Sequence, residues 1–501
     1  VNPAFSGKQV GVPAQYHQTT WCVEKTIDFI ESRRNTGEPW LISVNPFDPH
    51  PPLDPPQEYK DRLSIEDMPL PLWEDGEMEG KPPHQQKDVI QGGQDGQAEP
   101  IGSLTDEEKR EHFRDYYAEI ELIDDQFGRL LEYLDRTGQR EDTIVIFMSD
   151  HGEMSGDHGL YWKGAYFYEG LVHVPLIISC PSVFKQGLRC DALVELVDIA
   201  PTLMEAAGLE VPYFMQGKSF YGILTGEADP HHFKDAVYSE FYHCLRGTHE
   251  DIDATMYYNG RYKLVIYHGK EFGELYDHET DPNEFHNLWD KPEYETFKTE
   301  LVRKSFDHTI PVSYTHLRAH ETVLYSAIWI IPCTESMVSD KGDGEMSQKP
   351  VNIVWFCTDQ QRYDTIHALG NPYIHTPNID RLIEEGVAFT RAYTQAPVCT
   401  PSRSCFLTGR YPRTTKAFYN GNDNYSKDEK LVTKLLADSG YVCGLSGKLH
   451  LTSAQGRMEK RTDDGYSYVQ WSEHPNDDWP GGENDYQNWL KEKGLRWEDI
   501  Y

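Results

Sequence analysis

The 501-residue sequence lacks any apolar run that approaches the ~18 residues of a membrane-spanning helix. It also lacks a C-x-x-C pair, because its nine cysteines are odd in number and scattered along the chain. This excludes a regular disulfide framework and a C-x-x-C zinc site, and it is typical of a reducing compartment. Met346 stands only a few residues before a predicted strand and leaves no room for a signal peptide. We therefore expect a cytoplasmic protein.

Positive charge is also scarce. The chain has 47 lysines and arginines against 82 aspartates and glutamates, a net charge of −35. Nucleic acids and anionic membranes require a basic face, so neither is expected as a partner. An anionic small substrate would have to meet a local group of cations or a metal ion. The length indicates one large domain with a smaller one beside it.

Polar clusters follow four short apolar segments, each of which is typical of a buried strand in a parallel sheet. The segments are residues 39–44, 143–148, 351–357 and 441–445, and the clusters that follow them are Asp48 to His50, Asp150-His151, Asp359-Gln360 and Lys448 to His450. Taken alone, an aspartate can cap a helix and a histidine can be an ordinary hydrogen-bonded residue. Parallel strands end at one edge of a sheet, where ligands bind, so the four clusters together predict a shared site.

The segment from Cys399 to Arg403 reads C-T-P-S-R and is followed by T-G-R at residues 408–410. An isolated cysteine beside a proline could be an ordinary buried core residue. The full pattern, however, resembles the signature of the type I sulfatases of the alkaline phosphatase superfamily. The resemblance implies that Cys399 is oxidised to formylglycine, whose hydrate is the nucleophile. The partner would be a formylglycine-generating or an anaerobic sulfatase-maturating enzyme.

The same resemblance implies a divalent metal site. Its ligands would be Asp359, Gln360, Asp150, His151 and the modified Cys399, and its metal calcium, with manganese or magnesium as alternatives. The family's commonest pattern has an aspartate in place of Gln360 and an asparagine in place of His151. The pairings found here resemble a bacterial branch that includes phosphonate monoester hydrolases. This departure leaves the identity of the metal open.

The remaining catalytic roles also follow from the resemblance. Arg403 would steady the formylglycine, and Lys448 and Lys163 would hold the sulfate oxygens. His50 would protonate the leaving alcohol, and His450 would remove the second proton of the hydrate. Such local cations would reconcile an acidic protein with an anionic substrate.

These observations predict an α/β fold, with an alkaline-phosphatase-like, mostly parallel sheet flanked by helices and a small antiparallel subdomain. The predicted activity is hydrolysis of the sulfate ester of a small sugar, aryl or alkyl alcohol, with release of the alcohol and inorganic sulfate. Two alternatives remain at this point. One is a phosphonate or phosphate ester hydrolase, and the other is a chimeric chain without activity.

The order of the segments differs from the order in the family. Residues 346–501 resemble the first half of the catalytic domain and carry the signature, whereas residues 1–210 resemble the second half. Residues 211–308 are predicted to form the small antiparallel subdomain, with a hairpin turn at Asn259-Gly260. Residues 309–345 fit neither side, and we interpret them as an artefactual junction. The sequence therefore predicts circularly permuted halves, either from a mis-joined sequence, which we favour, or from a natural permutation.

Overall fold

The structure is a computed structural model. It describes residues 11–93, 99–307, 309, 351–422, 425–454, 458–473, 484–496 and 500. Apart from residue 309, the predicted junction lies outside these ranges.

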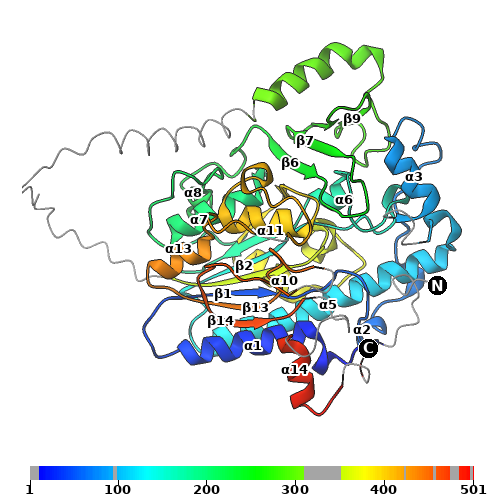
Figure 1. The fold of residues 1–501 in the computed structure, drawn as a ribbon. Helices are drawn as coiled ribbons and strands as arrows, with labels where there is room; N and C mark the ends of the chain where they lie inside the picture. The colour runs from blue at the N-terminus through cyan, green and yellow to red at the C-terminus, as the bar shows by residue number, and fades with distance from the viewer. Residues whose placement is uncertain are drawn as a thin grey trace, which may run out of the picture.

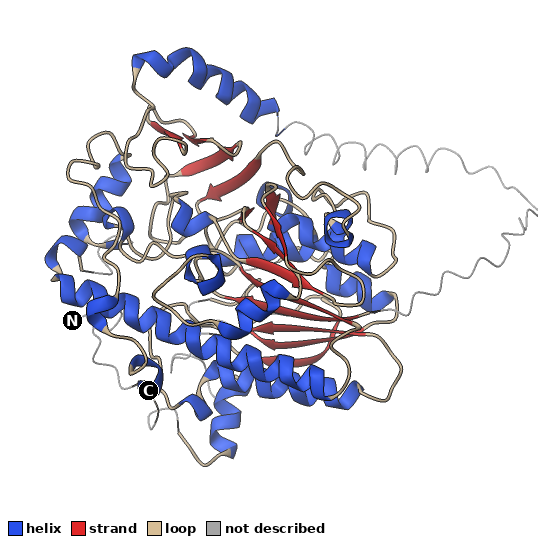
Figure 2. Cartoon of the chain, turned by 180° about the vertical axis from the view of Figure 1, so that it is seen from behind, coloured by secondary structure: helices blue, strands red, loops and turns tan. Residues whose placement is uncertain are grey.

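An eight-stranded sheet forms the centre of the molecule, in the order β14-β13-β1-β10-β2-β3-β11-β4 (Figures 1 and 2). Its first five strands run parallel: β14 (Tyr466–Trp471), β13 (Val442–Gly447), β1 (Trp40–Asn45), β10 (Asn352–Thr358) and β2 (Thr143–Ser149). β3 (Leu176–Ser179) is antiparallel to both of its neighbours, β2 and β11 (Val387–Phe389), and β4 (Leu188–Cys190) is parallel to β11. The predicted, mostly parallel α/β sheet is confirmed.

Segments far apart in the sequence alternate in this sheet. β10 lies between β1 and β2, with Ser43 opposite Trp355 on one side and Val145 opposite Val354 on the other. All residues of β1 and β2 are buried, as expected for strands with both faces covered. The two catalytic segments predicted from the sequence therefore contribute strands to one sheet.

Helices cover both faces of the sheet. On one face lie α1 (Gln18–Arg33), α5 (Asp106–Arg136), α10 (Pro377–Glu384) and α14 (Asp485–Glu492), and on the other α7 (Ile199–Ala206), α11 (Cys399–Thr408) and α13 (Val432–Asp438) (Figure 1). Successive strand residues enter opposite cores: Leu41 packs on the α11 side, and Ile42 on the α1 side. None of the helices in the described ranges has the length and apolarity needed to cross a bilayer.

A four-stranded antiparallel sheet stands beside the main one (Figure 2). It consists of β6 (Val237–Tyr242), β7 (Asp253–Tyr258), β8 (Tyr262–Tyr267) and β9 (Gly273–Asp277), in that order. The predicted turn at Asn259-Gly260 joins β7 to β8, and Gly260 has the positive φ of 92° that such a turn needs. The shorter elements are α2 (Gln57–Lys60), α3 (Pro83–Gln91), α6 (Glu169–Val172), α8 (Tyr221–Thr225), α12 (Pro412–Thr415), β5 (Val194–Glu195) and β12 (Ala392–Tyr393).

Candidate active site

The four polar clusters predicted from the sequence lie at one edge of the sheet, because the strands before them are neighbours in the order β13-β1-β10-β2. Backbone hydrogen bonds connect the segments just beyond the strand ends. The amide of Asp359 donates to the carbonyl oxygen of Asp48 at 3.2 Å, and the amide of Asp150 donates to that of Thr358 at 3.3 Å. The amide of Lys448 donates to the carbonyl oxygen of Asn45 at 2.8 Å.

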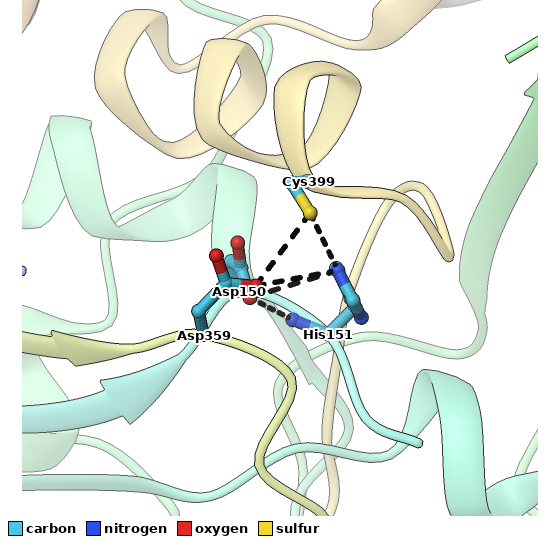
Figure 3. A group of neighbouring side chains, drawn as sticks. All are labelled: Asp150, His151, Asp359 and Cys399. Carbon is cyan, nitrogen blue, oxygen red and sulfur yellow. Dashed lines mark hydrogen bonds and ion pairs between the residues drawn. The ribbon is translucent and has the colours of Figure 1, made fainter. Parts of the chain in front are cut away.

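Cys399 is the first residue of α11, and its side chain points toward Asp150, His151 and Asp359 (Figure 3). The Sγ atom lies 3.0 Å from Nε2 of His151 and 3.5 Å from Oδ1 of Asp359. The start of the helix is tied to the sheet by Ser402, whose hydroxyl donates to the carbonyl oxygen of Asp150 at 2.6 Å. The thiol is fully buried, so its reactivity depends on these neighbours.

The group of Asp150, His151, Asp359 and Cys399 fits a metal ion. One potential ligand atom from each residue lies within 4.8 Å of the other three. Burial lowers the pKa of His151 despite the opposing effect of Asp150, so the imidazole stays neutral and keeps a lone pair for a metal. Two carboxylates supply the hard oxygen atoms that calcium, magnesium and manganese prefer.

Gln360 lies at the side of this group, with its backbone in the left-handed region at φ 69°. Its amide oxygen accepts a hydrogen bond from Nζ of Lys163 at 2.7 Å, and its amide nitrogen donates to Glu153. The backbone amide of Gln360 also donates to Oδ1 of Asp150 at 3.1 Å. The structure therefore brings all five residues predicted as metal ligands into one buried neighbourhood.

Three cations surround the carboxylates. Nε of Arg403 donates to Oδ2 of Asp150 at 2.9 Å, Lys448 forms a buried ion pair with Asp359, and Nζ of Lys163 lies 3.0 Å from the Cys399 sulfur. Burial works to raise the pKa of Asp359, but Lys448 above all holds it well below its ordinary value. These three cations are buried together with the carboxylates that they contact. Such a site suits an anionic substrate.

The two predicted acid–base histidines lie on either side of this centre. Nδ1 of His50 donates to the carbonyl oxygen of Pro51 at 2.6 Å, and its ring is near enough to contribute to the lowered pKa of Asp359. His450 is buried, and its carbonyl oxygen accepts a hydrogen bond from the hydroxyl of Thr400 at 2.8 Å. Its Nε2 lies 3.2 Å from Oε1 of Glu473.

Glu473 was not predicted from the sequence. It follows β14, which pairs in parallel with β13, so it emerges at the same sheet edge as His450. Burial raises its pKa to about 8, although Lys448 opposes the shift. The available signal was the strand-like segment 466–471, which ends in Ser472-Glu473 just as the other four strands end in polar residues.

Similarity to known proteins extends over parts of the chain. An arylsulfatase of Clostridium perfringens is 31% identical over 305 residues, which are 59% of this chain and 58% of the relative. An N-acetylglucosamine-6-O-sulfatase of Bacteroides thetaiotaomicron is 34% identical over 199 residues, 39% of this chain and 35% of the relative. The chain thus spans less than two thirds of the length of these relatives.

A phosphonate monoester hydrolase from Silicibacter pomeroyi has a similar structure, with a TM-score of 0.53 and 24% identity over 60% of this chain and 61% of that one. This likeness shows the alkaline-phosphatase-like fold.

The family model for the C-terminal part of N-sulphoglucosamine sulphohydrolase matches residues 156–309. The sulfatase family model matches residues 2–209 and 351–496, more than half of the sequence. The chain belongs to the sulfatase family.

Proposed function

We propose that this chain hydrolyses sulfate esters and that residue 399 acts after its conversion from cysteine to formylglycine. The observation that carries the proposal is the position of the Cys399 sulfur, 3.0 Å from both Lys163 and His151 and 3.5 Å from Asp359. Burial, followed by Asp359, raises the pKa of the Cys399 thiol to about 11. The unmodified thiol is therefore a poor nucleophile at neutral pH, which supports a modified residue at this position.

The charged side chains can act directly on a bound sulfate group. Lys163 and Lys448 would neutralise its oxygens, in a setting where removal of water strengthens each charge interaction. Arg403 positions the centre, because its guanidinium holds Asp150 and also donates from Nη1 to the carbonyl oxygen of Lys448 at 3.1 Å. These contacts give the substrate a rigid and positively charged receptor.

We assign proton transfer to His50 and His450. The Nδ1–H of His50 donates to the carbonyl oxygen of Pro51, so only the imidazolium form of His50 has a second proton, on Nε2, that can pass to the leaving alcohol. His450, beside Glu473, would take a proton from the second hydroxyl of the hydrated aldehyde at position 399. That second hydroxyl is what formylglycine supplies, since it lets the ester on residue 399 break at its C–O bond and release sulfate.

Asp150, His151, Asp359 and Gln360 would hold a divalent cation, for which calcium is the first choice and manganese or magnesium the alternatives. Such an ion, when bound, supplies positive charge next to the substrate and lowers the pKa of a neighbouring hydroxyl. The substrate class that we propose is a small sulfated sugar or an aryl or alkyl sulfate. The names of two relatives, an arylsulfatase and an N-acetylglucosamine-6-O-sulfatase, support this class.

A second candidate is hydrolysis of phosphonate or phosphate esters. It is favoured by Gln360 and His151, which resemble the pairings of the phosphonate monoester hydrolase branch. Both ester classes present tetrahedral oxyanions that the same cations can hold. Parallel measurement of kcat/KM on 4-nitrophenyl sulfate and on a phenyl phosphonate monoester separates the two, and we expect the sulfate ester to be preferred.

The modification is tested by co-expression with a formylglycine-generating enzyme, followed by mass spectrometry of the peptide that contains Cys399. We expect the mass of the aldehyde form, and sulfatase turnover only in the modified protein. Cys405→Ala is the matched control, because Cys405 is a second buried cysteine of the same helix. Cys399→Ala should lose turnover while Cys405→Ala keeps it. An unmodified but fully active protein contradicts the proposal.

We further propose that residues 1–210 and 346–501 are the two halves of one catalytic domain in permuted order, with residues 211–308 as the small subdomain. The active site needs both halves, since Asp150 and Lys163 come from one and Asp359 and Cys399 from the other. Their proximity counts against a chimera without activity. All eight cysteines in the described ranges are unpaired, which supports a reducing compartment such as the cytoplasm.

A further inference from the structure

A second buried cluster lies behind the active site, where the start of α1, the segment after β1 and the middle of α5 meet. It consists of His17, Asp48 and Asp54, of which one potential ligand atom each lies within 4.8 Å of the other two. Glu119 of α5 adjoins it, because its Oε1 accepts the backbone amide of Asp54 at 2.7 Å. All four side chains are at least 97% buried.

Several polar atoms in this cluster have no hydrogen-bond partner among the residues that the structure describes. They are Nε2 of His17, Oδ2 of Asp54 and Oε2 of Glu119. A buried polar group without a partner costs roughly 1–3 kcal/mol, and a charged one costs more. Three such atoms in one place therefore indicate that a group which satisfies them belongs there.

The charges are unbalanced in the same sense, because a protonated His17 beside Asp48 and Asp54 would offset only one of the three carboxylates. In the part of the chain that the structure describes, no lysine or arginine pairs with Asp48, Asp54 or Glu119. Lys60 of α2 is nearby, but its Nζ forms an ion pair with Oδ2 of Asp115 at 2.9 Å instead. Burial first, and then the carboxylates of Asp48 and Asp54, raise the pKa of Glu119 well above its ordinary value. Buried carboxylates of this kind are normally paired or coordinate a metal.

The ring nitrogens of His17 lie beyond the usual hydrogen-bond range of the two aspartates, with Nδ1 3.4 Å from Oδ2 of Asp48 and Nε2 3.7 Å from Oδ1 of Asp54. Nδ1 accepts the backbone amide of Thr19, and Oδ2 of Asp48 accepts the hydroxyl of the same residue. Nε2 of His17, which has no hydrogen-bond partner among the described residues, is therefore the nitrogen left for a metal. One imidazole nitrogen with two carboxylates is a donor set that zinc accepts.

We propose that His17, Asp48 and Asp54 form a second divalent-cation site that takes a transition metal of the zinc type. The site is separate from the cluster around Cys399. It is connected to that cluster through the backbone, because the carbonyl oxygen of Asp48 accepts the amide of Asp359. A metal there would join the start of α1 to the segment that carries His50, and so hold this edge of the catalytic centre in place. The inference does not depend on the reaction that the enzyme catalyses.

Two measurements test the proposal: the amount of zinc that the protein binds, and the position of that zinc in the structure. The full chain is stripped with a chelator, dialysed against Zn²⁺ and analysed by mass spectrometry for bound zinc. Asp54→Asn should hold one equivalent less than the unaltered chain, whereas Asp61→Asn, the same change at an exposed aspartate of the neighbouring segment, should hold the full amount. Asp359→Asn, in the catalytic cluster, should retain the equivalent bound by His17, Asp48 and Asp54.

Anomalous diffraction at the zinc edge, from crystals of the unaltered chain, gives an answer that does not require any variant to fold. The expected result is a peak enclosed by His17, Asp48 and Asp54. Equal zinc content in Asp54→Asn and the unaltered chain overturns the proposal. So does an anomalous map whose peaks lie only at the Cys399 cluster, which would mean that protons rather than a metal balance these carboxylates.

Discussion

Nζ of Lys163 lies 3.0 Å from Sγ of Cys399, although 236 positions separate the two residues in the chain. Lys163 comes from the segment after β2, and Cys399 begins α11. The contact is possible because β10 of the later segment inserts between β1 and β2 of the earlier one. The candidate active site is therefore a property of the assembled sheet and of neither segment alone.

Replacement of Lys448 by alanine should lower kcat for sulfate ester hydrolysis by about 10²- to 10³-fold, as expected when one preorganised charge is removed from a buried site. Lys448 is fully buried and pairs with Asp359, so no solvent cation can replace it easily. Steady-state kinetics on an aryl sulfate measures the effect. Lys270→Ala is the control, since this lysine pairs with Asp251 at the surface. Equal losses in the two variants would contradict the assigned role.

Removal of divalent cations should abolish turnover and lower the melting temperature. Asp150 and Asp359 would then face each other without the metal that they are proposed to share. Calcium restored at about 100 times its Kd should add ~2.7 kcal/mol to the free energy of unfolding. Activity and thermal unfolding are followed with EDTA and after addition of Ca²⁺, Mn²⁺ or Mg²⁺. Full activity after exhaustive chelation, with no metal retained in the protein, would exclude a catalytic metal.

Asp124 connects the part of the chain before residue 309 to the part after residue 350. It lies in α5, and its carboxylate accepts backbone amides at the start of α10, from Asn378 at 3.1 Å and from Ile379 at 2.8 Å. Asp124→Ala removes this cap and should reduce the free energy of unfolding by about 1–2 kcal/mol. Urea denaturation checks the value. Glu132→Ala, an exposed position of the same helix, should change it by no more than about 0.5 kcal/mol.

Because of Glu284, the free energy of unfolding is expected to depend on pH in the acid range. Burial works to raise its pKa, but Lys263 and then His278 lower it to about 2, from an ordinary value of 4.5. A carboxyl with a lowered folded-state pKa contributes stability that is fully present above pH 4.5 and is lost as the pH falls toward 2. The free energy of unfolding should therefore decrease over this interval.

Glu284→Gln provides the comparison. At pH 7 this variant leaves Lys263 with one carboxylate fewer, and we expect a loss of about 3 kcal/mol, as for a broken buried pair. The curves of the two proteins should converge as the pH falls toward 2, because protonation removes the same interaction from the unaltered chain. Parallel curves over the whole range would show that Glu284 does not titrate as described.

Much of the fold could be predicted because strand signals are local. The apolar segments that became β1, β2, β10 and β13 are short and continuous, and each ends in a polar cluster. The capping box at Thr105 likewise marks the start of α5 within four residues of sequence, and the structure contains it. The Cys399 signature is also local, so the proposed nucleophile could be predicted without any tertiary information.

The sequence by itself determined which residues follow which strands, and hence the polar groups available for chemistry. Only the tertiary structure decided which of these groups meet. Glu473 lies beside His450 because β14 pairs with β13, and His17 meets Asp48 and Asp54 because α1 packs across the end of β1. Strand order and helix docking depend on burial and pairing between residues hundreds of positions apart. No local pattern of residues encodes such long-range contacts.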